Sequence, residues 1–149
     1  MRKLFALLII GSVFTYYACN SAADSKDHTE HTAQNLEDSL YKSVMALHDE
    51  AMPKMGPLMG NQKTAQARLD SLTALGGASN AAMISRLSAL KDQLAAAEKG
   101  MNDWMEGFDP DPQGTPAENT VYFKSEKEKA QKMRDDIFVA LDSAAAILQ

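Results

Sequence analysis

The chain has little of several residue types that define other classes of protein. Its 149 residues include one cysteine, and 20 acidic residues against 15 basic ones give a formal net charge of −5. One cysteine excludes an internal disulfide and a cysteine-based zinc site. The negative charge gives no electrostatic support to nucleic-acid binding. With 8 glycines and 5 prolines, the composition is neither that of a collagen-like chain nor that of a chain disordered throughout. The length of 149 residues is that of one domain.

The chain also lacks a hydrophobic run long enough to cross a membrane. The apolar stretch that opens it, Leu4 to Thr15, has about twelve residues, whereas a spanning helix needs about twenty. It follows Arg2 and Lys3, and a positive start with a short apolar segment is typical of an export signal. The only cysteine, Cys19, comes shortly after this stretch.

This segment resembles the signal of a bacterial lipoprotein, in which a small residue precedes the acylated cysteine. The resemblance implies cleavage before Cys19, a diacylated thiol and an acylated new amino terminus. The alternatives are an ordinary secretory signal, or a single-pass anchor with Cys19 incidental. We expect residues 1–18 to be a lipoprotein signal peptide and Cys19 to carry the lipid, which holds the chain at a bacterial membrane facing the periplasm. The outer membrane is expected in preference to the inner one.

After the cysteine, residues 19–35 contain no large apolar side chain. Such a segment buries too little surface to offset its ordering entropy, so we predict a flexible tether. His28 and His31 form an H-x-x-H pair within it, for which disorder disfavours metal binding. Residues 36–149 are predicted to form a helical bundle domain.

Apolar residues recur at steps of three and four along three segments of this domain, the spacing of one face of an α-helix. The first predicted ladder is Leu36, Leu40, Val44, Leu47, Ala51, Met55, Leu58, Gln62, Ala65, Leu69 and Leu72. The second is Met83 or Ile84, Leu87, Leu90, Leu94, Ala97, Met101, Trp104 or Met105, and Phe108. The third is Val121 or Tyr122, Ala130, Met133, Ile137, Ala140 or Leu141, Ala144 and Leu148. The charged stretch from Lys124 to Lys132 is predicted to be exposed or lightly packed.

Proline and glycine mark the boundaries of these helices. Pro53 and Pro57 predict a kink or break in the first, because proline removes a helix hydrogen bond. Thr115 to Glu118 has the spacing of a capping box with proline at the first helical position. No segment alternates as a strand does. The sequence therefore predicts an all-α fold, an antiparallel three-helix bundle whose first helix is kinked or broken near Pro53–Pro57.

Two short motifs resemble those of a known family. They are Val44-Met45-Ala46-Leu47-His48-Asp49-Glu50-Ala51-Met52-Pro53-Lys54-Met55 and Met101-Asn102-Asp103-Trp104-Met105. Together they resemble small Bacteroidetes-type lipoproteins labelled "viral A-type inclusion protein", which have a lipobox, an H-D-E-x-M-P-K-M segment and a W-M segment before the last helix. The resemblance covers most of the mature chain. It implies a Bacteroidetes source and this architecture, and no established activity.

One stripe of side chains could carry chemistry. Its members, at steps of three and four, are Met45, His48, Met52, Met55 and Met59. We interpret the stripe as core packing, because methionine fills irregular gaps such as those beside a proline kink. The alternative is a Cu(I) site, since thioethers and imidazole are ligands for that soft ion and Met101 and Met105 could approach from the second helix.

Other polar groups form no convergent site. His48, Asp49 and Glu50 are consecutive, so they point about 100° apart on a helix, and no second histidine completes H-E-x-x-H. The run from Asp109 to Pro112 lacks EF-hand spacing and is interpreted as a stiff acidic turn. Trp104 is expected in the core, with a surface anchor for a partner as the alternative.

These observations predict a protein that is not an enzyme and has no cofactor besides the lipid on Cys19. The predicted function is that of a lipid-anchored binding or structural module of the cell envelope. Its expected partners are the membrane, reached through the lipid, and another envelope protein or a second copy of the chain; no nucleic acid is expected. The alternative is a periplasmic protein that handles copper or another metal through the Met/His stripe.

Overall fold

The computed structural model describes the backbone of residues 22–149 and, apart from residues 22–30, 77 and 78, their side chains. The elements are α1 (Ala22–Ala51), the short 3-10 helix η1 (Met52–Lys54), α2 (Met55–Ala74), η2 (Gly77–Asn80), α3 (Ala81–Gly107) and α4 (Pro116–Leu148). No strand occurs in this part of the chain, so the all-α prediction is confirmed there. None of the described helices combines the length and hydrophobicity needed to cross a membrane. The predicted signal peptide and Cys19 lie outside the described residues.

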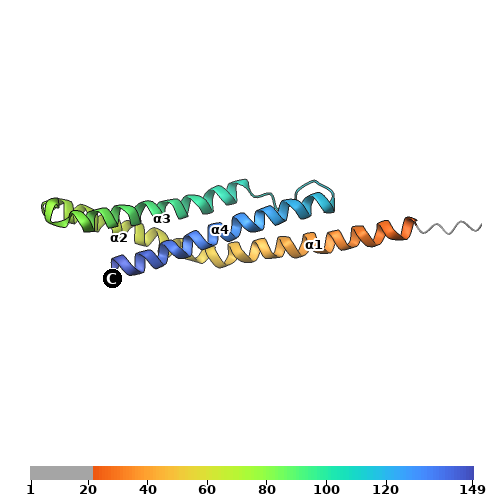
Figure 1. Ribbon diagram of the computed structural model, residues 1–149, viewed down its shortest axis with the longest axis horizontal. Coiled ribbons are helices and arrows are strands. Elements are labelled where there is room, and N and C mark those ends of the chain that lie inside the picture. The colour runs from red at the N-terminus through yellow and green to blue at the C-terminus, as the bar shows by residue number, and fades with distance from the viewer. Residues whose placement is uncertain (1–21) are drawn as a thin grey trace, which may run out of the picture.

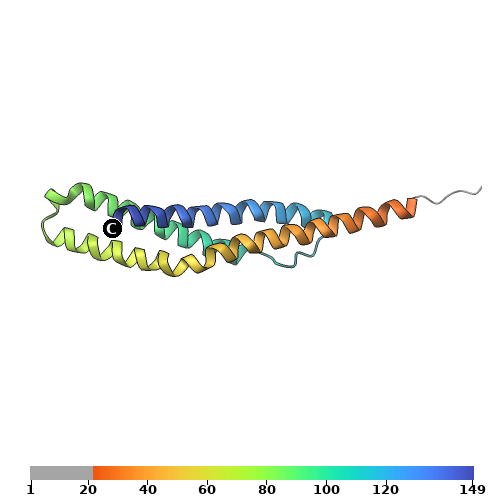
Figure 2. The ribbon, with the colours of Figure 1, turned by 90° about the horizontal axis from the view of Figure 1, so that it is seen from below.

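The helices lie side by side in a long rod. Figure 1 shows α1 leading into α2 along the rod, α3 returning beside α2, and α4 running back past α3 to the C-terminus. α1 packs mainly against α4, α2 packs against α3 and α4, and α3 packs against α4. Figure 2 shows the α2–α3 turn at one end of the rod, while the first turns of α1 project beyond the other end.

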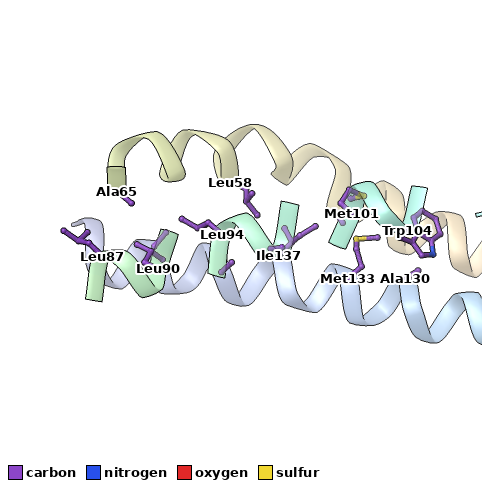
Figure 3. Close-up of a cluster of buried hydrophobic side chains, with 14 of the residues drawn as sticks. Leu58, Ala65, Leu87, Leu90, Leu94, Met101, Trp104, Ala130, Met133 and Ile137 are labelled. Atoms are coloured by element: carbon purple, nitrogen blue, oxygen red, sulfur yellow. The ribbon is translucent and has the colours of Figure 1, made fainter. Parts of the chain in front are cut away.

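Buried side chains follow the predicted ladders closely, and Figure 3 shows part of this core. On the first two helices the fully buried row is Val44, Ala51, Leu58 and Ala65. On α3 the buried residues are Leu87, Leu90, Leu94, Ala97, Met101 and Trp104, and on α4 the core row is Ala130, Met133, Ile137, Ala140 and Ala144. The seven-residue repeat is the one that keeps a continuous apolar seam between helices packed nearly in line. Leu36 is an exception to the predicted ladder, because it is 43% exposed.

The 3-10 helix η1 lies where Pro53 interrupts the first helical segment. Proline has no N–H to donate to the carbonyl four residues earlier. The chain tightens there, and the Met55 N–H donates to the Met52 carbonyl three residues back. Half-buried apolar residues border the buried row on both sides of η1, for example Leu47 in α1 and Leu69 in α2.

The structure differs from the sequence-based expectation at the start of α1. Composition predicts a tether over residues 19–35, whereas residues 22–35 are helical. Contacts with α4 hold the end of this stretch. The Asn119 amide donates to Glu37, just beyond it, over 2.9 Å, and the Thr120 hydroxyl, which donates to the Pro116 carbonyl over 2.7 Å, lies 3.4 Å from the Ala33 carbonyl. The composition argument considered burial alone, but extending a packed helix avoids the cost of nucleating a new one.

The predicted capping box at the start of α4 is confirmed. The Glu118 N–H donates to the Thr115 hydroxyl over 3.4 Å, and the Thr115 N–H donates to the Glu118 carboxylate over 2.9 Å. The bond from the Thr115 backbone, followed by the bond from its hydroxyl, holds the pKa of Glu118 below its ordinary value of 4.5.

We expect acid to weaken this cap. Because the pKa of Glu118 is lower in the folded chain, the stabilising contribution is present above the ordinary pKa and is lost as pH falls through the lowered folded value. Thermal unfolding followed by circular dichroism should therefore show wild type and Glu118→Gln differing at neutral pH and converging in acid. The exposed Glu128→Gln serves as the control. A Glu118→Gln difference that stays constant with pH would contradict this assignment.

Candidate functional site

Six ring side chains from three helices meet near the end of the rod where α3 gives way to α4. They are Tyr41, His48, Trp104, Phe108, Tyr122 and Phe123, and the ring centroids in contact lie between 4.8 and 6.5 Å apart. We call this group the aromatic cluster. Each pair adds about 0.5–1.5 kcal/mol beyond its buried area. Phe108 contacts four of the others, so the cluster ties α1, α3 and α4 together at this level.

A buried carboxylate lies against the aromatic cluster. Trp104 is 8% exposed, as expected for a core residue, and its indole N–H donates to the Glu126 carboxylate over 3.1 Å. The second carboxylate oxygen of Glu126 accepts a bond from Lys129 over 2.6 Å. Glu126 is only 3% exposed, so both of its oxygens are paired inside the protein. The same hydrogen bond raises the pKa of Lys129.

The prediction that residues 124–132 are exposed or lightly packed is wrong at Glu126. The charged neighbours hid its position in the pattern. Steps of four and three taken backwards from Ala130 lead to Glu126 and then to Phe123, and both are buried. The seven-residue register of α4 was therefore the signal from which the burial of Glu126 and Phe123 could have been predicted.

The methionine stripe does not form a core seam along its length. Met52 is 45% exposed and Met59 is 44% exposed, so the core-packing prediction is wrong for these two residues. Met45, His48 and Met55 are half-buried. The buried row precedes the row of Met45, Met52 and Met59 by one residue in each seven-residue repeat, and successive helix residues point about 100° apart. The stripe therefore lies on the flank of the first helical segment.

Two further methionines do fill the core. Met101 and Met133 are 0% and 4% exposed, and Figure 3 shows them grouped with Trp104 at one end of the buried cluster. Gap filling, the role predicted for the stripe, is thus performed by methionines of α3 and α4.

The exposed methionine flank faces α3. Gln62 on α2 donates to Glu98 over 2.7 Å, and Lys91 donates to Gln66 over 3.0 Å. Glu98 and Lys91 are seven residues apart on α3, and Met105 takes the next position of that row. Met105 is 39% exposed and directly follows Trp104, against which the His48 ring packs at a centroid distance of 5.7 Å. Met105 therefore lies on the side of α3 that faces α1, at the level of His48.

His48 has one ring nitrogen engaged and a side chain that is 18% exposed. Its Nδ1 lies 3.0 Å from the Asp49 carboxylate. With the proton on Nδ1, the ring donates to Asp49 and leaves Nε2 as an electron-pair donor. This is the arrangement in which a carboxylate orients a metal-binding imidazole.

The other candidate residues lie elsewhere on the rod. The side chain of His28 lies outside the described residues, and His31 is exposed on α1. Asp109 and Asp111 form an acidic turn, in which the Asp111 N–H donates to the Asp109 carboxylate over 3.0 Å and the Asp109 N–H donates to the Tyr122 hydroxyl over 2.7 Å. Burial raises the pKa of Tyr122. Among the side chains that the structure describes, no three or more of His, Cys, Asp and Glu are grouped to hold a metal ion.

A shallow hollow lies between α2 and α3 near their turn. Its volume is about 420 Å³, and it is lined by Thr64, Ala67, Arg68, Ser71, Leu72, Met83 and Leu87. Arg68 is held there because its guanidinium donates to the Leu148 carbonyl over 2.5 Å, which satisfies the C-terminal end of α4. Leu75 is 77% exposed at the same end of the rod.

The geometry therefore offers one aromatic cluster with a paired buried carboxylate, one flank with exposed thioethers and an oriented imidazole, and one apolar hollow. Comparisons of the chain with protein-family models, with curated proteins and with solved structures found no match.

Proposed function

We propose that the chain is a lipid-anchored, non-catalytic module of the bacterial cell envelope, of the Bacteroidetes-type lipoprotein group that its motifs resemble. In this proposal acyl chains on Cys19 hold the protein at a membrane facing the periplasm. The body is an antiparallel three-helix bundle, bent at Pro53–Pro57, that binds another envelope protein or a second copy of the chain.

The observation that carries this proposal is the place of Cys19 in the sequence, shortly before the first residue of α1. The only cysteine follows two basic residues and a short apolar stretch, and α1 begins three residues after it at Ala22. α1 projects from one end of the rod, and the α2–α3 turn with Leu75 and the hollow lies at the other (Figure 1). Lipid on Cys19 would thus leave the α2–α3 end as the end farthest from the membrane.

The non-catalytic part of the proposal is supported by the bonds that several polar side chains make. Glu126 pairs with Trp104 and Lys129, and Arg68 satisfies the end of α4. Asn119 links Glu37 with the start of α4. Each of these groups joins two elements of the fold or closes a helix end. None is left over next to a nucleophile or a second catalytic group, which is what general acid–base or covalent catalysis requires.

Growth with an alkyne-labelled fatty acid tests the anchor. We expect wild type to take up the label and to be processed to a chain that begins at Cys19, and Cys19→Ser to take up none, because no second thiol exists. Ser21→Ala, which keeps the cysteine and changes a neighbouring polar residue, should be labelled as wild type is. Unlabelled wild type, or label retained by Cys19→Ser, would remove the basis of the proposal.

A further inference from the structure

We propose that His48, Met52 and Met105 form a Cu(I)-binding site on the surface of the rod, between α1 and α3. The site goes beyond the anchoring and binding roles above and does not depend on the lipid. Its ligands are one imidazole nitrogen and two thioether sulfurs, contributed by two helical segments that are distant in the sequence.

Two of the three ligands lie on one helical segment. His48 lies in the last turn of α1 and Met52 is the first residue of η1. They are four residues apart, the spacing that in an α-helix brings Cβ atoms to about 5–6 Å of one another. A methionine side chain has three rotatable bonds, so its sulfur can swing onto an ion held by the imidazole. Met52 is 45% exposed, so its side chain borders solvent on the flank where this movement takes place.

The third ligand comes from α3. Met105 belongs to the row of Lys91 and Glu98, both of which bond to α2 across the same flank. It is adjacent to Trp104, whose ring meets that of His48. Met105 is 39% exposed, so its thioether is reachable from solvent at the level of His48. Leucine or isoleucine would serve a purely structural flank as well as these flexible sulfur-bearing side chains.

The bond between His48 and Asp49 is the independent sign of a ligand site. A histidine that only packs against Trp104 does not need a carboxylate on Nδ1. With that contact at 3.0 Å, Asp49 engages Nδ1 and leaves Nε2 as the ring nitrogen available to a metal ion. The half-buried position of His48 also keeps the ring from turning freely.

The ligand set selects the metal. Thioethers are soft donors that suit Cu(I), whereas Zn²⁺ sites use thiolate, imidazole and carboxylate, and Mg²⁺ and Ca²⁺ use oxygen. The described side chains provide no cluster of His and acidic residues for those harder ions. Binding of Cu(I) here involves no redox step, since the ion enters and leaves in the same oxidation state.

The test is an anaerobic titration with Cu(I) against a chromogenic Cu(I) chelator, using the full chain in detergent micelles. All titrations use the Cys19→Ser background, because a free thiol at Cys19 would itself bind Cu(I). We expect one Cu(I) per chain, with quenching of the fluorescence of Trp104, the only tryptophan. Zn²⁺ should neither bind stoichiometrically nor quench.

The variants separate the site from general thioether binding. Met52→Leu with Met105→Leu should lower Cu(I) affinity at least tenfold, while circular dichroism and thermal unfolding stay close to wild type, because leucine conserves volume. Met83→Leu is the matched control, since Met83 is also 39% exposed on α3 but lies at the far end of the rod. Asp49→Asn should weaken binding by about tenfold through the orientation of His48.

Three results would overturn the site. The first is no stoichiometric binding at micromolar Cu(I), which would leave the stripe as an apolar flank. The second is unchanged affinity in the Met52→Leu, Met105→Leu chain. The third is an equal loss in Met83→Leu, which would indicate unspecific thioether binding. None of these results bears on fatty-acid labelling of Cys19, so failure here is distinguishable from failure of the anchor.

Discussion

Replacement of Ile137 by Ala is expected to lower the free energy of unfolding by about 2–5 kcal/mol. Ile137 is completely buried on α4, and Figure 3 shows it among core side chains of α2 and α3. The loss combines the transfer energy of three carbons with the cavity that three helices, fixed along their length, cannot close. Ile137 is the middle residue of the core row of α4, so its truncation tests the core that the helices share.

Val139 provides the matched control for this prediction. It lies two residues along α4 and is 56% exposed. Val139→Ala should change the free energy of unfolding by less than about 0.5 kcal/mol. Urea denaturation followed by circular dichroism at 222 nm, the usual helix signal, measures both. Equal effects of the two substitutions would mean that α4 does not bury this face against α2 and α3.

The second large effect is expected at Glu126. Glu126→Ala should cost about 2–4 kcal/mol, because it removes the acceptor of the Trp104 N–H in a buried place and also removes packed methylenes. The cost arises because the Trp104 N–H loses its acceptor in a nearly buried position, where Trp104 is only 8% exposed. Lys129, which is mostly exposed, loses a partner but can return to solvent at little cost.

Two further variants identify the cause. Glu126→Gln keeps the carbonyl oxygen that accepts from Trp104, so most of the stability should be retained. Glu128→Ala, at an exposed position two residues away, should have little effect on stability. Denaturant titration by Trp104 fluorescence reports directly on this environment. If the Ala and Gln variants of Glu126 were equally stable, the bond to Trp104 would not be the origin of the effect.

Much of the fold could be predicted because burial follows a local period. Val44, Leu58 and Leu94 are buried at the places that steps of three and four require. The capping box at Thr115 and the 3-10 helix that contains Pro53 follow from backbone chemistry that neighbouring residues decide. These features depend on few tertiary contacts, so a single sequence contains the information needed to place them.

The site could be predicted only in part because a 3-4 pattern can fit two adjacent faces. Met45, Met52 and Met59 repeat every seven residues, as do Val44, Ala51 and Leu58. Each residue of the valine, alanine and leucine row directly precedes a methionine of the other row. Which row is buried depends on where α3 and α4 lie, and that is set by the whole bundle. The helix therefore buries the row with smaller side chains, which lets the helices approach closely, and leaves the larger thioethers outside.

The spacing of apolar residues also could not predict contacts between side chains that are distant in the sequence. Nothing near Glu126 indicates that its acceptor oxygen will meet Trp104, and nothing near His48 indicates that it will meet the same ring. Charge alone suggested exposure for Glu126. In the fold, the N–H groups of Trp104 and Lys129 that donate to Glu126 offset most of the cost of burying its carboxylate. Glu126 is therefore buried as its position in the helix repeat requires, although its side chain is charged.

The direction in which α1 leaves the rod has a mechanical consequence. α1 runs along α4 and continues past its start, so tension applied at the amino end of α1 acts parallel to the contact between the two helices (Figure 2). Such a load shears the whole interface at once and does not peel it open one turn at a time. A chain held by that end would therefore resist drag from its surroundings far better than one held through the turn between α2 and α3.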